Sequence, residues 1–241
     1  MLLIMTISLV AGLATVAGAL LTLIVGRSTR RILAGILGLA AGIMLGVVVL
    51  DLLPSAWTLG GVRSLILGTG AGWGFVWLLS LALGRNPSDR RTGSPGYLIK
   101  LGYLVAVGIA LHDLPEGIAI AAGYAATPEL GWLIALAIGL HNIPEGMAMA
   151  APMVLGGQSF RYIIGTAGLV SLVTPMGAFL GLLLVGISHR LIAYLLAFAG
   201  GSMAYIVIRE LWPEGRVQGR RWAALGAVLG WLIVGLLLHL E

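Results

Sequence analysis

Long runs of apolar residues, each about the length of a membrane-spanning helix, follow one another along nearly the whole chain. A helix needs about 20 such residues to cross the hydrocarbon core of a bilayer. The runs predict eight spans, near Leu2–Val25, Ile32–Leu53, Arg63–Leu83, Leu101–Tyr124, Leu130–Leu155, Tyr162–Ile187, Leu191–Ile208 and Trp222–Leu240. We therefore expect an all-α integral membrane protein, in which eight transmembrane helices form one compact domain over residues 1–241.

The polar stretches between these runs are short, and the longest separates the third span from the fourth. Residues 84–99 begin with GRNPSDRRTGSPG, which is basic and rich in turn formers, so they predict a loop. A second basic connection, Glu210–Arg221, divides the last two spans. The first apolar run has neither the basic start nor the cleavage site of a signal peptide, and we interpret it as a span.

Composition and charge agree with a chain that crosses a cell membrane several times. Apolar residues make up 59% of the chain and charged residues 10%, and the mean hydropathy is +1.06. With both termini outside, all but two of the 14 Lys and Arg residues face the cytoplasm, the exceptions being Arg63 and Arg190. The loop 84–99 is then cytoplasmic. The net charge of +5 therefore reflects topology and does not indicate nucleic-acid binding.

Two stretches of the chain are nearly identical and carry ionisable groups within apolar runs. They are Gly108–Gly123, GIALHDLPEGIAIAAG, and Ile138–Pro152, IGLHNIPEGMAMAAP. In each, a His and a Glu four residues apart share one helical face. Because an ionisable group within hydrocarbon costs roughly 2.5–3.5 kcal/mol on insertion scales, the two pairs indicate a compensating cation.

The position of the two stretches predicts a metal site at the bilayer midplane. His112 and His141 lie near the centres of the fourth and fifth spans, which are consecutive and antiparallel. Pro115 and Pro144 lack an amide hydrogen and are predicted to interrupt both helices. Interrupted helices line midplane sites in transporters, where the freed carbonyls face protein or a wet cavity.

The residue types in these stretches favour a divalent transition metal. The candidate ligands are His112, Asp113, Glu116, His141, Asn142 and Glu145. Mixed imidazole nitrogen and carboxylate oxygen suit Zn²⁺, Fe²⁺, Mn²⁺, Co²⁺ or Ni²⁺ better than Ca²⁺, Mg²⁺ or Cu⁺. Three carboxylates leave room for one ion or two adjacent ions. The chain has no Cys to supply a thiolate, and we expect the metal as bound substrate with no prosthetic group.

The HDLPEG and HNIPEG segments, on the fourth and fifth of eight spans, resemble the signature helices of the ZIP (Zrt/Irt-like) divalent metal transporters. AAGIMLGVVVLDLLP in the second span and GGSMAYIVIRELWPEG in the seventh are also similar to that family. The resemblance implies uptake of Zn²⁺, and of Fe²⁺, Mn²⁺, Co²⁺ and Cd²⁺, into the cytosol through a mononuclear or binuclear midplane site. It also implies a homodimer in the plasma or inner membrane.

Carried over by position, the resemblance also implies a role for each candidate ligand. His112, Glu116, His141 and Glu145 would be primary ligands, Asp113 and Asn142 would complete the shell of a second ion, and Met44 on the second span would be a thioether ligand.

The chain departs from the family pattern at three places. Thr174 precedes Pro175 where many relatives carry Glu, which weakens the case for two tightly held ions. Asp113 stands where many relatives have Asn and restores part of that charge. The loop at 84–96 contains no His, so the His-rich metal-handling loop of some relatives is absent from it.

Other interpretations predict different functions for the same residues. An intramembrane zinc-dependent hydrolase would need an open metal position and a substrate cleft, and the usual HExxH helix is absent from the sequence. A metal sensor or scaffold would need a soluble output domain. The His and Glu residues could instead be polar contacts between helices, as could Asp113 and Asn142. The duplicated context favours the transporter, whose partners are metal ions and lipid.

Three further residues have two interpretations each. Asp51, near the outer end of the second span, is either an entrance carboxylate or a helix-end polar group at the interface. Glu210 and Glu214 either guide the exit or form surface ion pairs with the neighbouring Arg209 and Arg216.

Overall fold

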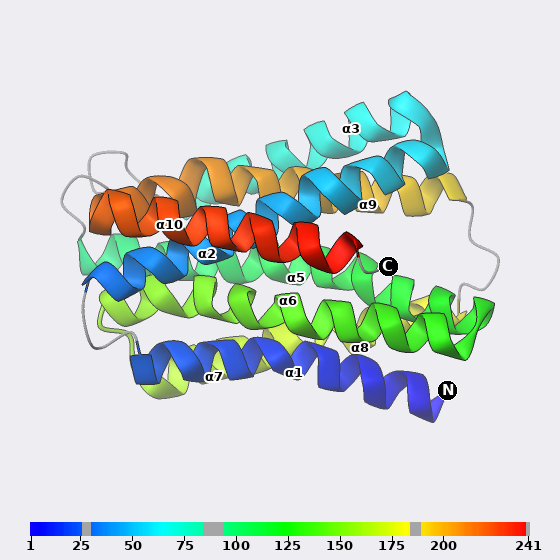
Figure 1. The fold of residues 1–241 in the computed structure, drawn as a ribbon, viewed down its shortest axis with the longest axis horizontal. Coiled ribbons are helices and arrows are strands. Elements are labelled where there is room, and N and C mark those ends of the chain that lie inside the picture. Colours follow the sequence, from blue (N-terminus) through cyan, green and yellow to red (C-terminus); the bar gives the residue numbers. More distant parts are fainter. Residues whose placement is uncertain (26–29, 84–93, 184–188, 240–241) are drawn as a thin grey trace.

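The computed structural model describes residues 1–25, 30–83, 94–183 and 189–239, which are helical throughout apart from short turns and contain no strand (Figure 1). The helices are α1 (Leu2–Val25), α2 (Arg30–Val47), η1 (Val48–Leu52), α3 (Leu53–Ala82), α5 (Pro95–Ala126), α6 (Pro128–Leu155), α7 (Phe160–Ser171), α8 (Val173–Leu183), α9 (His189–Ile206), η2 (Val207–Leu211) and α10 (Trp212–His239). The prediction of an all-α protein is confirmed.

Six helical stretches of the described chain are long and apolar enough to cross a membrane. Two of them are much longer than a bilayer is thick: Arg30–Ala82 has 53 residues and Arg190–Leu236 has 47, or about 80 and 70 Å of helix. The first is broken at Gly61, whose φ of 71° glycine adopts without strain. The second is broken at Gly219. In Figure 1 the chain turns back after α2, so that α3 runs antiparallel to it.

Each long stretch also contains a five-residue π-helical segment that ends two residues before a proline. The segment η1 carries Asp51 and is followed by Pro54, and η2 carries Glu210 and is followed by Pro213. Proline has no amide hydrogen and crowds the preceding turn. A wider π turn relieves that crowding, and such turns often mark functional positions.

Two predicted connections are shorter than expected. Helix α5 begins at Pro95, so residues 95–99 are helical and the prediction of a loop to 99 is wrong there, while 84–93 lie outside the described residues. The Ser94 side chain accepts a hydrogen bond of 3.4 Å from the Tyr97 amide, and Pro at the first helical position fixes the start. The predicted connection Glu210–Arg221 is also mostly helical, because α10 begins at Trp212.

The prediction that prolines interrupt the fourth and fifth helices is wrong. Helices α5 and α6 continue through Pro115 and Pro144. Each proline removes one backbone hydrogen bond, and packing against neighbouring helices keeps the helix continuous. The break occurs in the predicted sixth span, where α7 ends at Ser171 and α8 begins at Val173, shortly before Pro175.

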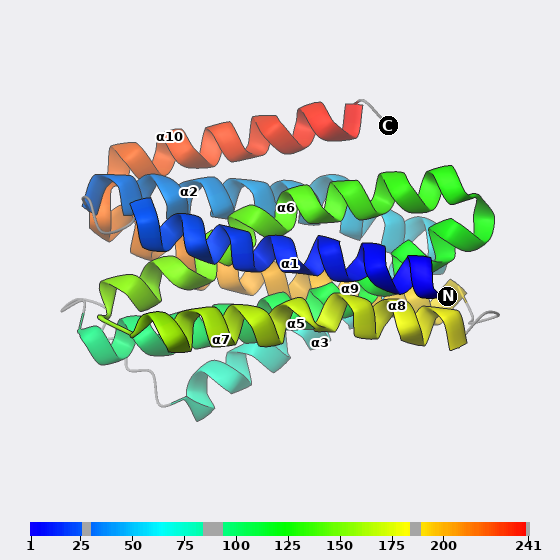
Figure 2. The same cartoon turned by 90° about the horizontal axis from the view of Figure 1, so that it is seen from below.

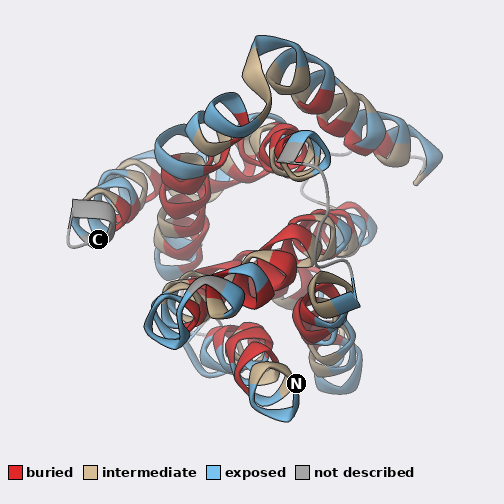
Figure 3. Cartoon of the chain, turned by 90° about the vertical axis from the view of Figure 1, so that its right-hand side faces the viewer, coloured by how far each residue is buried: buried red, intermediate tan, exposed pale blue. Residues whose placement is uncertain are grey.

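The helices form two groups that meet along the middle of the bundle. In the first group, α2 packs on α10 and α3 packs on α9. In the second, α6 packs between α1 and α5, α5 packs on α8, and α7 packs on α1. Contacts of α5 with α9 and of α2 with α6 join the groups. Figure 1 shows the first group above the second, and Figure 2 looks onto the second group, with α1, α6, α7 and α8 in front. Viewed along the helices, buried residues face inward and exposed residues cover the outside (Figure 3).

Glycines allow the backbones of α1 and α6 to touch. A Cβ atom added at Gly146 would overlap the carbonyl oxygen of Thr15, and one added at Gly18 would overlap the carbonyl oxygen of Ile143. Membrane helices associate through such small residues because water does not drive them together. The close contact brings α1 against the part of α6 that carries His141, Asn142 and Glu145.

We expect Gly146→Ala to destabilise the protein by about 1–3 kcal/mol, because the new methyl group forces the two backbones apart. Gly139→Ala on the same helix is the control, since its Cβ would stand 3.5 Å from the nearest atom, Ala11 Cα. The midpoint of thermal unfolding in detergent measures both effects. Equal midpoints for the two variants would contradict the packing described above.

Candidate metal centre

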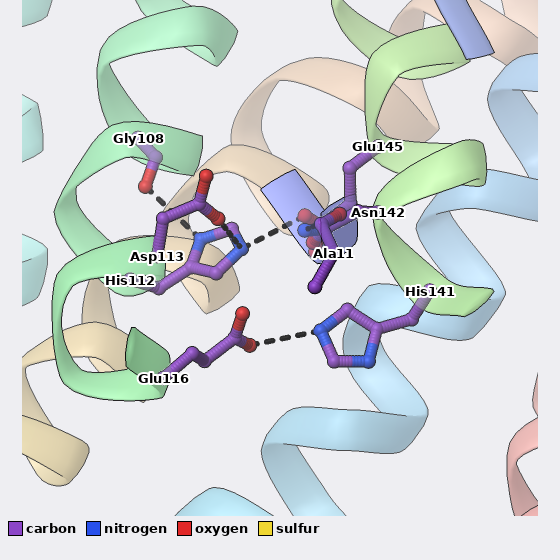
Figure 4. Close-up of polar contacts among 8 residues, drawn as sticks. All are labelled: Ala11, Gly108, His112, Asp113, Glu116, His141, Asn142 and Glu145. Atoms are coloured by element: carbon purple, nitrogen blue, oxygen red, sulfur yellow. Dashed lines mark hydrogen bonds and ion pairs between the residues drawn. The ribbon is translucent and has the colours of Figure 1, made fainter. Parts of the chain in front are cut away.

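The six polar residues of the two similar stretches lie together inside the bundle (Figure 4). Helix α5 contributes His112, Asp113 and Glu116, and α6 contributes His141, Asn142 and Glu145. All are buried except the His141 side chain, which is 13% exposed. Because the two helices are antiparallel neighbours, the duplicated segments face each other.

The His and Glu residues pair between the helices. His112 Nε2 lies 2.9 Å from Glu145 Oε2, and His141 Nε2 lies 2.9 Å from Glu116 Oε1. The sequence predicts that each His shares a face with the Glu of its own helix. The structure shows that each Glu instead reaches the His of the neighbouring helix, so that the two pairs are reciprocal.

The surroundings of His112 require a positive charge between its ring and Glu145. His112 Nδ1 lies 3.1 Å from the Gly108 carbonyl oxygen, which can only accept, so Nδ1 carries a hydrogen and donates it. In a neutral imidazole Nε2 would then have only a lone pair, facing a carboxylate oxygen. A contact of 2.9 Å between these two atoms therefore needs a proton between them or a metal ion that both atoms bind.

Several oxygen atoms of the site have no hydrogen-bond donor within the described part of the chain. They are both carboxylate oxygens of Asp113, Oε2 of Glu116, Oε1 of Glu145 and Oδ1 of Asn142. Asp113 Oδ1 lies 3.4 Å from His112 Nε2. Buried oxygens are rarely left without a partner, and carboxylate oxygens with imidazole nitrogens are the ligands of borderline divalent metals.

One ligand atom from each of His112, Asp113 and Glu116 lies within 4.8 Å of the others, which is close enough for a shared ion. This spacing and the oxygens without donors fit a metal. Met44 is also wholly buried, within the apolar core on α2. Its role as a ligand stays a prediction.

A backbone carbonyl and the Thr15 hydroxyl group near the site were not predicted as part of it. Asn142 Nδ2 donates a hydrogen bond of 3.0 Å to the Ala11 carbonyl on α1, and this bond directs its amide oxygen away from α1. The hydroxyl groups of Thr15 and Thr174 are wholly buried and lack a hydrogen-bond partner among the residues described. Thr174 stands out in the sequence because it precedes Pro175 where many relatives carry Glu, but an alanine carbonyl has no sequence signal.

Carboxylates also lie on both π-helical segments. Asp51 on η1 is exposed, accepts a hydrogen bond of 3.1 Å from Ser55, and is close enough to Glu116 and His141 to interact electrostatically. Glu210 on η2 and Glu214 on α10 are buried, so of their two interpretations the one that places them at the surface does not hold. Gln218 donates a hydrogen bond of 2.8 Å to Glu214.

A bundle of long apolar helices with imidazole and carboxylate groups at its core defines a multi-pass membrane protein that carries metal-ligand side chains within its helices. Residues 85–238 match the family model described as ZIP zinc transporter. The chain therefore belongs to the ZIP zinc transporter family, as its two signature segments indicated.

Individual relatives agree with this assignment over nearly the full length. The chain is 35% identical to the zinc transporter ZupT of Salmonella heidelberg, and 34% identical to those of Salmonella newport and Salmonella typhimurium. Each alignment covers 95% of this chain and 93% of the relative. The protein is thus an integral membrane transporter of divalent metal and not an enzyme.

Proposed function

We propose that the protein carries Zn²⁺, and related divalent ions such as Fe²⁺, Mn²⁺, Co²⁺ and Cd²⁺, towards the cytosol. The ligands are His112, Asp113, Glu116, His141, Asn142 and Glu145. The reciprocal pairing of His112 with Glu145 and of His141 with Glu116 carries this proposal. A divalent ion that takes the place of the proton between nitrogen and oxygen satisfies both atoms at once.

The charge of the site supports a divalent ion. Asp113, Glu116 and Glu145 bring three negative charges into a buried region. Uncompensated charges there cost several kcal/mol each. A divalent ion offsets two of these charges, and two neutral imidazoles add ligands of the kind that zinc prefers.

We infer eight crossings with both termini outside. The breaks at Gly61 and Gly219 divide the two longest helical stretches into lengths that each fit a bilayer. The first turn of α1 and the last turn of α10 both lie in the right-hand half of the bundle in Figure 1, as an even number of crossings requires. His112 and His141 lie halfway along α5 and α6, which supports a site near the midplane.

The carboxylates of the π-helical segments support a route through the bundle. Asp51, exposed and within electrostatic reach of Glu116 and His141, would meet an ion arriving from outside. Glu210 and Glu214 are buried near the end of the bundle that carries most of the basic residues, which we infer to be cytoplasmic. They would meet the ion on its way in. Met44 remains a candidate ligand, and a homodimer in the lipid bilayer remains a prediction.

The division into two groups supports a way to open the site alternately to each side. All six proposed ligands belong to α5 and α6, within the group of α1, α5, α6, α7 and α8. The other group contributes no ligand from this set. Sliding or rocking of one group against the other would therefore carry an intact site across the barrier.

Linking the two groups should stop transport. A Cβ atom at Gly108 on α5 would overlap the Ile206 side chain on α9, so Gly108→Cys with Ile206→Cys brings two thiols together. The chain has no native Cys. We expect a short thiol crosslinker to abolish Zn²⁺ uptake by this double variant in proteoliposomes, and cleavage of the link to restore it.

The matched control is Gly102→Cys with Met153→Cys, which links α5 to α6 inside one group. The crosslinked control should keep its uptake. Full uptake by the crosslinked Gly108 and Ile206 variant would contradict relative movement of the two groups.

Removal of a ligand should slow metal uptake. We expect His112→Ala and Glu145→Ala to reduce Zn²⁺ uptake at least about tenfold in liposomes that contain a zinc-sensitive dye, since loss of a ligand of this kind costs 10- to 100-fold or more in affinity. Glu129→Ala is the control, because Glu129 is an exposed carboxylate in the first turn of α6. Variants that carry Zn²⁺, Fe²⁺ and Mn²⁺ as fast as the wild type would disprove the proposed pathway.

Acid should weaken metal binding. Imidazole and carboxylate ligands bind a metal only when deprotonated, so protons compete with it and the affinity falls as the pH falls. Between pH 7.5 and 5.5 we expect the Zn²⁺ affinity to fall at least about tenfold, because an ordinary His titrates near pH 6.5. Equilibrium dialysis measures this, and His141→Gln should show a shallower dependence. A pH-independent affinity would exclude imidazole ligands.

A further inference from the structure

A groove of about 410 Å³ runs between α2, η2 and α10, and no residue of α5 or α6 lines it. Small residues, Ala41 and Gly42 on α2 and Ala227 on α10, leave the space open between larger side chains. The large side chains beside it include Trp212 and Trp231, and the lining is apolar throughout. A groove of this size and composition, on the side of a helix bundle in a membrane, suits a hydrocarbon chain.

Exposed arginines lie at one end of this groove, on the helix faces that line it. Arg216 follows Trp212 by one turn of helix and shares its face. Arg220 precedes Trp231 by three turns and lies on the same face of α10. Arg221 stands next to Arg220, and all three arginines are exposed. The apolar groove therefore leads to a group of positive charges.

The start of α2 adds to the positive charge at this end. A Cβ atom at Gly219, where α10 is broken, would lie 3.3 Å from the side chain of Ala34 on α2. Helix α2 begins just before that contact with Arg30 and Arg31, which are both exposed. The acidic residues of η2 and of the first turn of α10 are buried. The exposed surface that the described residues form at this end is therefore basic.

We propose that the groove binds one anionic phospholipid from the leaflet at this end of the bundle. The phosphate lies at Arg216 and Arg220, and one acyl chain fills the groove beside Trp212 and Trp231. Basic pockets between membrane helices hold negatively charged head groups, and the planar fork of arginine matches the oxygens of a phosphate. The site is separate from the proposed metal ligands and needs no metal.

The arginines favour a lipid over a second copy of the chain as the occupant. In a two-fold symmetric dimer the same face of each copy meets at the interface. A dimer joined at this groove would bring the arginines of both copies to the same level, where like charges repel. An anionic head group compensates the same charges, whereas a zwitterionic lipid has no net charge to offer them.

Lipids with brominated acyl chains test the site, because bromine quenches the fluorescence of a tryptophan that it touches. The purified protein in neutral detergent is titrated with phosphatidylglycerol or with phosphatidylcholine, both carrying the same brominated chains. We expect phosphatidylglycerol to bind at least about fivefold more tightly, the effect of one arginine near a membrane surface. Trp212→Phe combined with Trp231→Phe should remove the quenching that saturates at low lipid concentration.

Single substitutions separate the head group from the chain. Arg216→Gln and Arg220→Gln should each lower the affinity for phosphatidylglycerol about fivefold and leave that for phosphatidylcholine unchanged. The matched control is Arg161→Gln, which removes an exposed arginine from the first turn of α7 in the other group of helices.

Two neighbouring residues of α10 test the groove itself. Val228 lines it and is 60% exposed, so Val228→Phe should fit without strain, fill the groove and weaken the binding of both lipids. Leu229 is similarly exposed and does not line the groove, so Leu229→Phe should change neither affinity.

Equal wild-type affinities for the two lipids would overturn the proposal. So would a preference for phosphatidylglycerol that persists in both arginine variants, or saturable quenching that survives the loss of Trp212 and Trp231. Crosslinking of Val228→Cys between two copies, without any lipid preference, would assign the groove to a dimer and overturn it too. None of these measurements uses metal, so their outcome does not depend on whether the protein carries Zn²⁺.

Discussion

Three carboxylates and two imidazoles are buried inside the bundle, where almost no water solvates them. The rest of the structure depends on how this lack of solvation is compensated. Their cost is reduced because each Glu reaches the His of the neighbouring helix. This reciprocity requires two antiparallel helices that present the same segment at the same level. The duplication of HDLPEG and HNIPEG therefore reflects a site made of two halves. The His and the Glu of each half are paired only when the other half is present.

The helices around α5 and α6 differ in how closely they pack against this pair. Helices α1 and α8 approach α6 and α5 so closely that glycines are needed at the contacts, as at Gly146 and Gly117. The first group of helices, α2, α3, α9 and α10, forms a separate layer that carries Asp51 and Glu210 on its π-helical segments and Glu214 at the start of α10. Close packing thus fixes the six candidate ligands inside one layer, and in our proposal the other layer lines the route on either side.

Properties that depend on local sequence could be predicted. Apolar runs predicted the helices, and the cost of burying His112 and Glu145 indicated them as candidate ligands, which the structure shows to be buried and paired with each other. The reciprocal pairing could not be predicted, because the helical period places each His next to the Glu of its own helix. The prediction that the prolines interrupt their helices is wrong for a related reason. Pro115 would break an isolated helix, whereas packing against neighbouring helices keeps α5 continuous. Glu214 was misjudged because Arg216 is close in sequence while burial depends on distant helices.

The hydrogen bond from Asn142 to the Ala11 carbonyl joins residues 131 positions apart. Since α1 is synthesised more than a hundred residues before α6, it enters the bilayer before its partner exists. During that interval its buried polar residues, Ser8, Thr15 and Thr22, have only their own helix and lipid around them. Two of them, Ser8 and Thr22, donate to carbonyls of α1 itself and so need no partner from another helix. The Asn142 side chain therefore forms its hydrogen bond with a helix that was synthesised long before its own.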